Sequence, residues 1–240
     1  MMENMQSAAE KHLHIITGHY GSGKTEFAVN YAFRLSLAGY NVTLADLDIV
    51  NPYFCSRGQR EALESRGARV IASTGGDADV PALNPEVYAL LEKDVCGILD
   101  VGGDAAGARV LGRFAPKIRT MEYELFCVLN FNRPETATPE KAGRYLRAIE
   151  RSAKLAATGL INNTHLCGDT TVEDVLRGAE LAEELASCVK IPVRYHAFPR
   201  WVGNIAGLPP ETLFPMEIVL KKPWENGSEF EKEEMLWQEK

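Results

Sequence analysis

The sequence predicts one α/β domain, in which a doubly wound, mostly parallel sheet has helices on both faces and forms three layers. Short apolar runs alternate with helix-like stretches along most of the 240 residues, which is typical of parallel βαβ units. The runs CGIL (96–99) and LFCVL (125–129) are apolar without alternation, as strands buried on both faces should be. No repeat or low-complexity linker divides the chain, so we expect a single domain over residues 1–224.

The individual elements follow from the periodicity of the apolar residues. Phe27, Tyr31 and Leu35 stand four positions apart, which indicates one face of a helix. The predicted helices span Glu26–Ala38, Pro85–Lys93, Pro139–Ala157 and Val172–Val189. The predicted strands span His12–Thr17, Asn41–Ala45, Arg69–Ala72, Cys96–Leu99, Glu124–Leu129, Thr158–Ile161 and Pro192–Ala197.

Composition excludes several classes of protein. The chain has 26 Lys and Arg against 33 Asp and Glu, a net charge of -7, which argues against non-specific binding to nucleic acid or to an anionic membrane. No apolar run approaches the roughly 20 residues of a membrane span, and the N-terminus lacks the apolar segment of a secretory signal. The five cysteines are odd in number and never form CxxC. We therefore expect reduced thiols in a cytoplasmic protein.

The last 16 residues, 225–240, differ from the rest of the chain. They contain six Glu and two Lys, a net charge of -4, with four large apolar residues between them. Charged ends are usually solvated, so an acidic C-terminal tail on the surface is one interpretation. A peptide that docks on a partner is the other.

The strongest functional motif is a phosphate loop. Residues Gly18–Thr25 fit the pattern GxxxxGK followed by Ser or Thr, between the first predicted strand and helix. Glycines let the backbone turn tightly and direct N–H groups at a phosphate, and the following helix adds its N-terminal dipole. Lys24 is expected to reach the β- and γ-phosphates, and the Thr25 hydroxyl to bind Mg²⁺. The expected nucleotide contacts in this segment are Gly18, Tyr20, Gly21, Ser22, Gly23, Lys24, Thr25 and Glu26.

Acidic motifs follow two other predicted strands. Asp46 and Asp48 stand two residues apart in DLDIVNP, at the strand end where α/β sheets bind ligands. Asp100 ends the run CGIL, as a Walker B carboxylate does, and is expected to hold Mg²⁺. Gly103 completes a DxxG sequence and is expected to sense a γ-phosphate through its N–H. The alternative for Asp46 and Asp48 is that they only cap a following helix.

These motifs, in this order, resemble the ParA/MinD/CobQ group of P-loop nucleotide-binding proteins, which includes the nitrogenase iron protein. The resemblance covers most of residues 13–200. It implies that Asp46 lies in the outer shell of Mg²⁺, that Asp48 orients the attacking water, and that two copies pair around ATP. The group's extra lysine at the second loop position is His19 here, so such a homodimer would lack its trans-acting lysine. The implied catalytic residues are Lys24, Asp48 and Asp100, and the implied metal-site residues are Thr25, Asp46 and Asp100.

Base recognition separates ATP from GTP. Related GTPases recognise guanine through a four-residue motif after a strand: Asn or Thr, then Lys, any residue, and Asp. The corresponding segment here, Asn130–Arg133, has neither Lys nor Asp. The resemblance to the iron protein places an adenine-contacting amide at Asn163 and packs Pro199 and Arg200 against the base. An amide suits adenine because it can accept from N6 and donate to a ring nitrogen. The alternative for Asn163 is that its side chain only satisfies backbone groups of a loop. The alternative for Pro199 is that it only ends a strand. The expected cofactors are ATP and Mg²⁺.

The expected function is a Mg-ATP-dependent ATPase that acts as a switch for a protein partner of unknown identity. A group-transfer enzyme is the alternative, either a small-molecule kinase or a ligase like CobQ and dethiobiotin synthetase. Its acceptor pocket would use the loops Asp77–Asn84 and Asn132–Thr136. A GTP-dependent metallocentre-maturation chaperone is a further alternative, against which the missing guanine motif and the missing Cys/His cluster count.

Overall fold

The computed structural model describes residues 13–47, 63–65, 67–71, 86–91, 95–103 and 105–219. Eight strands form one sheet in the order β3-β2-β4-β1-β5-β6-β7-β8, and every pairing is parallel. The strands are β1 (Leu13–Gly18), β2 (Val42–Asp46), β3 (Ala68–Ile71), β4 (Cys96–Asp100), β5 (Tyr123–Leu129), β6 (Gly159–Asn162), β7 (Val193–Pro199) and β8 (Leu213–Met216). The helices are α2 (Lys24–Leu37), α4 (Glu86–Ala89), α5 (Ala105–Ile118), α6 (Pro139–Ala153) and α7 (Val172–Val189), with short 3-10 helices η2 (Cys167–Asp169), η3 (Arg200–Val202) and η4 (Pro210–Thr212).

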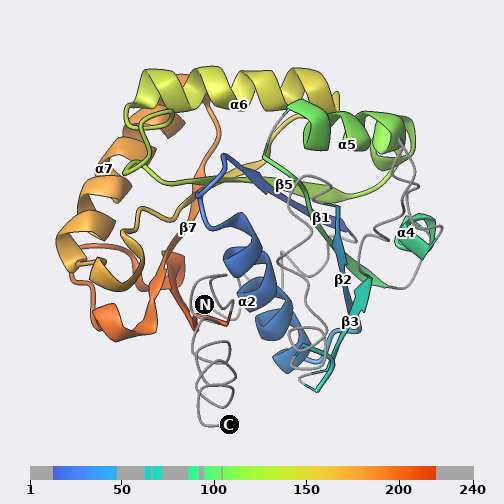
Figure 1. Cartoon of the computed structure of the whole chain (residues 1–240), viewed down its shortest axis with the longest axis horizontal. Helices are drawn as coiled ribbons and strands as arrows, with labels where there is room; N and C mark the ends of the chain where they lie inside the picture. The colour runs from blue at the N-terminus through green and yellow to red at the C-terminus, as the bar shows by residue number, and fades with distance from the viewer. Residues whose placement is uncertain are drawn as a thin grey trace, which may run out of the picture.

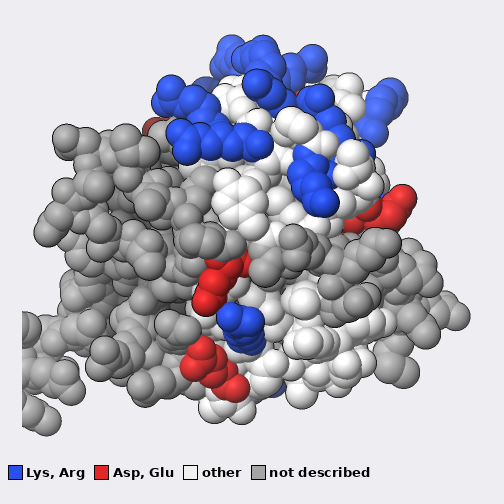
Figure 2. All heavy atoms as spheres, turned by 90° about the vertical axis from the view of Figure 1, so that its right-hand side faces the viewer, with Lys and Arg blue, Asp and Glu red and all other residues white. Residues whose placement is uncertain are grey.

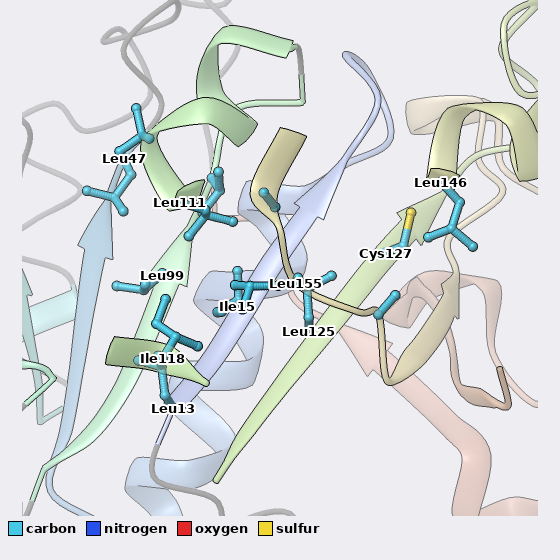
Figure 3. Packing of buried hydrophobic residues seen from close by; sticks show 14 of the residues in the cluster. Leu13, Ile15, Leu47, Leu99, Leu111, Ile118, Leu125, Cys127, Leu146 and Leu155 are labelled. Carbon is cyan, nitrogen blue, oxygen red and sulfur yellow. The ribbon is translucent and has the colours of Figure 1, made fainter. Parts of the chain in front are cut away.

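Helices cover both faces of the sheet, which confirms the predicted three-layer α/β architecture. Helix α2 lies on one face, and α5 and α6 lie side by side on the other (Figure 1). Successive strand residues point to opposite faces. Leu13 and Ile15 of β1 therefore belong to one core with Leu111 and Ile118 of α5, which Leu146 of α6 joins beside Cys127 (Figure 3). The next residue, Ile16, points to the opposite face and belongs to the core beneath α2.

The face beneath α2 is rich in aromatic rings. Phe27 lies 4.8 Å from Phe214 between ring centroids, and Tyr31 meets Phe126 edge-on at 5.8 Å. Arg34 places its guanidinium 3.7 Å above the Phe214 ring and donates to the carbonyl of residue 215 at 3.0 Å. These contacts fasten the last strand of the sheet to α2.

Two elements were missing from the sequence prediction. Helix α5 contains Gly107, Gly112 and Pro116, which read as helix breakers when neighbours are unknown. A Cβ on Gly112 would lie 2.9 Å from the Ser152 carbonyl oxygen, so this glycine lets α5 pack closely on α6. Strand β8 is only four residues long and contains a proline, which an edge strand tolerates. The predicted helix Pro85–Lys93 was too long, because α4 spans Glu86–Ala89.

The direction in which the chain crosses the sheet reverses beside β1. The chain leaves β1 through α2 toward β2 on one side, and leaves β4 through α5 toward β5 on the other. Ligands of α/β proteins bind at such a reversal, outside the carboxyl ends of the strands. Gly18, Asp46 and Asp100 end three of the strands at this edge. The predicted tail, 225–240, lies outside the described residues, and within them no helix has the length and apolar character of a bilayer span.

A buried histidine makes stability depend on pH. His196 lies inside β7, where burial lowers its pKa from 6.5 to about 4. Because the unfolded chain binds this proton more readily, stability is fully present above pH 6.5 and is lost as the pH falls toward 4. We expect this group to lower the free energy of unfolding by up to about 3 kcal/mol across that window. Urea unfolding at several pH values should show a shallower decline in the His196→Asn variant. An identical decline in both proteins would contradict the assignment.

Candidate functional site

The predicted phosphate loop begins inside β1 and ends at the start of α2. Gly21 and Gly23 have φ values of +75° and +79°, a conformation that only glycine adopts without strain. The N–H of Ser22 donates to the His19 carbonyl at 2.9 Å and closes a tight turn. Gly23 is the N-cap of α2 and gives it no side-chain hydrogen bond. The first amides of the helix therefore keep their capacity to bind an anion.

The loop lies directly against the segment that follows β4. A Cβ on Gly103 would overlap the Gly18 carbonyl group, whose carbon would be 2.9 Å away. A Cβ on Gly18 would in turn lie 2.6 Å from Ser22 Oγ and closer still to the Val128 carbonyl oxygen. Glycine is therefore required at both positions by close packing. The structure thus brings together the loop and the DxxG glycine, which sequence analysis had assigned to one site.

Two residues that follow β5 hold the tip of the loop. Asn130 Nδ2 donates to the Gly21 carbonyl at 3.2 Å, and Arg133 Nε donates to the same oxygen at 3.1 Å. Asn130 is fully buried, and its Nδ2 also donates to the His165 carbonyl at 3.2 Å. Sequence analysis placed Arg133 in a candidate acceptor loop, but it assigned neither residue to the support of the phosphate loop. Their position after a central strand was the available signal, because loops at that edge converge on the ligand.

Asn163 holds the next peptide group of the loop. Its Nδ2 donates to the Ser22 carbonyl at 2.7 Å, and its side chain occupies the space that a Cβ on Gly23 would need. Asn163 is 2% exposed. Its Oδ1 is buried with no hydrogen-bond partner in the described part of the chain. The amide thus satisfies a backbone group and keeps one buried acceptor beside the loop.

Two buried acidic residues lie side by side at the ends of neighbouring strands. Asp46 and Asp100 are register partners of β2 and β4, and they are 4% and 1% exposed. Lys24 is buried to a similar degree, at 8% exposed. The hydroxyls of Thr17 and Ser22 are buried and make no hydrogen bond within the described ranges. Asp48 lies outside the described residues.

This set of groups suits Mg²⁺ and a phosphate chain. Mg²⁺ prefers one or two carboxylates together with phosphate oxygens and water, which Asp46 and Asp100 can supply. The glycine-lined loop has no side chain at the places where its backbone must approach an anion closely. Unsatisfied buried hydroxyls are costly unless a ligand or water completes them. The residues present therefore fit a magnesium-bound polyphosphate.

His19, at the second position of the loop, contacts helix α6. Its ring meets that of Tyr145 edge-on at 5.1 Å, and its Nδ1 lies 2.9 Å from the Tyr20 carbonyl oxygen. The Tyr145 hydroxyl donates to the Gly103 carbonyl. Tyr145 therefore touches both the loop and the DxxG segment. Tyr20 is 68% exposed.

The remaining predicted contacts are Glu26 in the first turn of α2 and Pro199 and Arg200 at the end of β7. Glu26 Oε1 accepts from the Val219 N–H at 2.6 Å, so this carboxylate holds the chain after β8 on α2. Pro199 ends β7, and Arg200 opens η3 with an ion pair to Glu217 at 3.5 Å. Within the described residues, no hydrogen bond connects Arg200 to the phosphate loop.

The structure describes one of the two loops that sequence analysis proposed as an acceptor pocket. Asp77–Asn84 lies outside the described residues. In Asn132–Thr136, Asn132 Nδ2 donates to Asp174 Oδ1 at 3.1 Å, and the Thr136 hydroxyl donates to the Asn130 carbonyl at 2.6 Å. These bonds join the loop to α7 and to the Asn130 support, so this segment builds the frame around the phosphate loop.

Comparison with known proteins gives no family. No family model and no curated protein matches the sequence. Among solved structures, the chain is similar to chloroplast FtsY from Physcomitrella patens, with 18% identity and a TM-score of 0.54 over 86% of this chain and 62% of that one. It is also similar to the signal recognition particle receptor FtsY from Elizabethkingia anophelis, with 18% identity and a TM-score of 0.50 over 76% and 57% of the two chains.

These similarities concern the fold. The chain spans about three fifths of the length of both FtsY chains. The fold is that of an α/β P-loop NTPase, as the parallel sheet with the loop after β1 also indicates.

The hydrogen bond from Arg133 to the Gly21 carbonyl can be tested by substitution of the arginine. Arg133→Ala removes a charged hydrogen bond to the loop, and such bonds contribute about 1.5–3 kcal/mol. Because part of this energy holds the loop ready for phosphate, we expect the affinity for Mg·ATP or Mg·GTP, measured by calorimetry, to fall about tenfold. Arg147→Ala on the exposed side of α6 is the matched control and should bind like wild type. Equal affinities in all three proteins would show that Arg133 does not order the loop.

Proposed function

We propose that the chain binds Mg·ATP in the phosphate loop, hydrolyses it and acts as a nucleotide-dependent switch for a protein partner. The observation that carries this proposal is the packing of Gly103 on Gly18 beside the buried pair Asp46 and Asp100. A γ-phosphate in the loop would meet the DxxG segment and the carboxylates at once. Membership of the ParA/MinD/CobQ group is part of the same proposal and is supported by the order of these motifs.

Each residue at the edge of the sheet has a role in holding the nucleotide. Lys24 neutralises the β- and γ-phosphates. The Thr25 hydroxyl and the Asp100 carboxylate hold Mg²⁺, with Asp46 in its outer shell. Bound Mg²⁺ offsets the negative charge that builds up on the phosphates during transfer. Asp48 orients the attacking water.

The switch uses the contact between Gly103 and its neighbours. The Gly103 N–H bonds the γ-phosphate, and its carbonyl accepts from the Tyr145 hydroxyl. Loss of the phosphate on hydrolysis removes one of these two restraints. The position of α6 relative to the loop then responds to the nucleotide, which is how a switch changes the surface shown to a partner.

The choice of ATP rests on Asn163 and on the missing guanine motif. The buried Oδ1 of Asn163 has no hydrogen-bond partner in the described ranges, and it can accept from the 6-amino group of adenine. Guanine has a carbonyl oxygen at that position, which would repel the same acceptor. Pro199 and Arg200, at the end of β7, pack against the base in this proposal.

Nucleotide binding is tested by calorimetry with Lys24→Ala. We expect wild type to bind Mg·ATP more tightly than Mg·GTP, and the variant to lose at least tenfold in affinity because the phosphate charge is no longer neutralised. Lys117→Ala, which removes an exposed lysine of α5, should bind normally. Preferential binding of GTP would reject the role of Asn163 and favour the metallocentre chaperone. Stoichiometric phosphorylation of a small molecule would favour group transfer.

The role of Asp48 predicts a separation of binding from turnover. Asp48→Ala should bind Mg·ATP within about threefold of wild type, whereas single-turnover hydrolysis should slow at least about 100-fold because the attacking water is no longer oriented. Asp169→Ala, at an exposed carboxylate of η2, is the control. Turnover at the wild-type rate in Asp48→Ala would remove this residue from the mechanism.

A further inference from the structure

The basic side chains of α5 and α6 lie on the outer surface of the molecule. Figure 2 shows Lys and Arg side chains clustered over this layer. The two helices carry seven basic residues against two glutamates, whereas α7 carries five carboxylates and one arginine. All seven basic residues are exposed, as charged side chains usually are, so water can solvate their charges. Arg133, which follows β5, has a different environment.

The charge of Arg133 is half-buried and has no counter-ion in the described part of the chain. Its Nε donates to the Gly21 carbonyl at 3.1 Å, and none of the ion pairs among the described residues includes it. A guanidinium has five N–H donors, of which this bond uses one. Withdrawing a charged group from water is unfavourable unless other groups replace the water. The remaining donors of Arg133 are therefore available to a ligand.

The position of the guanidinium is fixed by the glycine that it covers. A Cβ on Gly21 would lie 2.7 Å from Arg133 Nε, 2.9 Å from Cζ and 3.0 Å from Nη2. Arg133 thus fills the space that the missing side chain of Gly21 leaves. A group that is already in place loses less conformational freedom when a ligand binds. The guanidinium is therefore preorganised for a contact with a ligand.

Arg133 lies between the tip of the phosphate loop and the segment after β6. The Gly21 carbonyl that it binds also accepts from Asn130 Nδ2, which donates to the His165 carbonyl as well. His165 stands two positions after Asn163. The amides that bind phosphate line the inner side of such a loop, whereas Arg133 holds a carbonyl from outside. Its remaining donors therefore suit the part of a ligand that lies beyond the phosphates, on the side of Asn163.

We propose that Arg133 stacks its guanidinium on the base of the bound nucleotide and makes the site selective for purines. This inference rests on the proposed function, in which the nucleotide extends from the loop toward Asn163. A guanidinium is planar and weakly hydrated, and it stacks on flat rings. A purine offers two fused rings to this plane, whereas a pyrimidine offers one.

The buried acceptor of Asn163 cannot make this selection alone. Adenine and cytosine both carry an exocyclic amino group that donates a hydrogen bond, so Oδ1 would accept from either base. A contact with the face of the ring distinguishes the two by size, because dispersion attraction grows with the number of atoms in contact. Arg133 therefore supplies a discrimination that the amide lacks.

The test is calorimetry of the full chain with Mg·ATP, Mg·GTP, Mg·CTP and Mg·tripolyphosphate, for wild type and Arg133→Lys. Lysine keeps the charge and can donate to the Gly21 carbonyl, but it has no plane to stack. We expect wild type to bind ATP at least about tenfold more tightly than CTP. In Arg133→Lys the affinity for ATP should fall about tenfold, as loss of a stacking contact does. The affinity for tripolyphosphate, which has no base, should stay within about twofold.

The comparison of ligands separates this role from support of the loop. Arg147→Lys, on the exposed side of α6, is the matched control and should bind all four ligands like wild type. The inference is overturned if Arg133→Lys weakens ATP and tripolyphosphate equally, because Arg133 then acts only through the loop. It is also overturned if wild type binds ATP and CTP alike.

Failure of the proposed function gives a different result. Preference for GTP in wild type would reject the choice of adenine, yet a selective loss of GTP affinity in Arg133→Lys would still support the stacking contact, since guanine is also a purine. Wild type that binds tripolyphosphate as tightly as any nucleotide would overturn the contact and leave the phosphate loop in place. Wild type that binds none of the four ligands would overturn both proposals.

Discussion

The contact between the backbones at Gly18 and Gly103 sets the geometry of the whole site. A Cβ on Gly103 would overlap the Gly18 carbonyl group, and a Cβ on Gly18 would overlap the Val128 carbonyl oxygen. The end of β1 therefore lies backbone against backbone with the segment after β4 and close to β5. This approach requires β1 and β4 to be adjacent, which the strand order provides. It also brings the carboxylate of Asp100 beside the phosphate loop. A side chain at either glycine would separate the parts that a bound phosphate must touch together.

The loop is held from outside, so that its inner surface is left for a ligand. Asn163 fixes the orientation of the Ser22 carbonyl, because its Nδ2 donates to that oxygen at 2.7 Å. In a trans peptide the carbonyl and the following N–H point in opposite directions. Fixing the Ser22 oxygen therefore turns the Gly23 N–H the other way, as an anion-binding loop needs. Asn130 and Arg133 restrain the preceding peptide group at Gly21, so the loop is ordered before any ligand arrives.

Local patterns in the sequence were sufficient for seven of the eight strands, for the phosphate loop and for the position of Asp100 at the end of a strand. These features depend on residues close together in the chain, as an apolar run that ends in Asp shows. Helix α5 was missed because the tolerance of Gly112 depends on Ser152, which is 40 positions away. The support from Asn130 and Arg133 was missed for the same reason. Their partner is a carbonyl more than 100 residues earlier, and no spacing rule connects such positions.

Helix α6 connects the phosphate loop to the outer surface of the molecule. Its inward Tyr145 contacts Gly103 and the ring of His19, while Arg144 and Arg147 on neighbouring positions face outward. Net charge could not predict this arrangement, because it averages α7 with α5 and α6. In the proposed switch, a shift of Gly103 on nucleotide exchange would move α6 and the arginines that it carries. Linkage is reciprocal, so a partner that favours one position of α6 would change the affinity for nucleotide by the same factor as nucleotide changes the affinity for that partner.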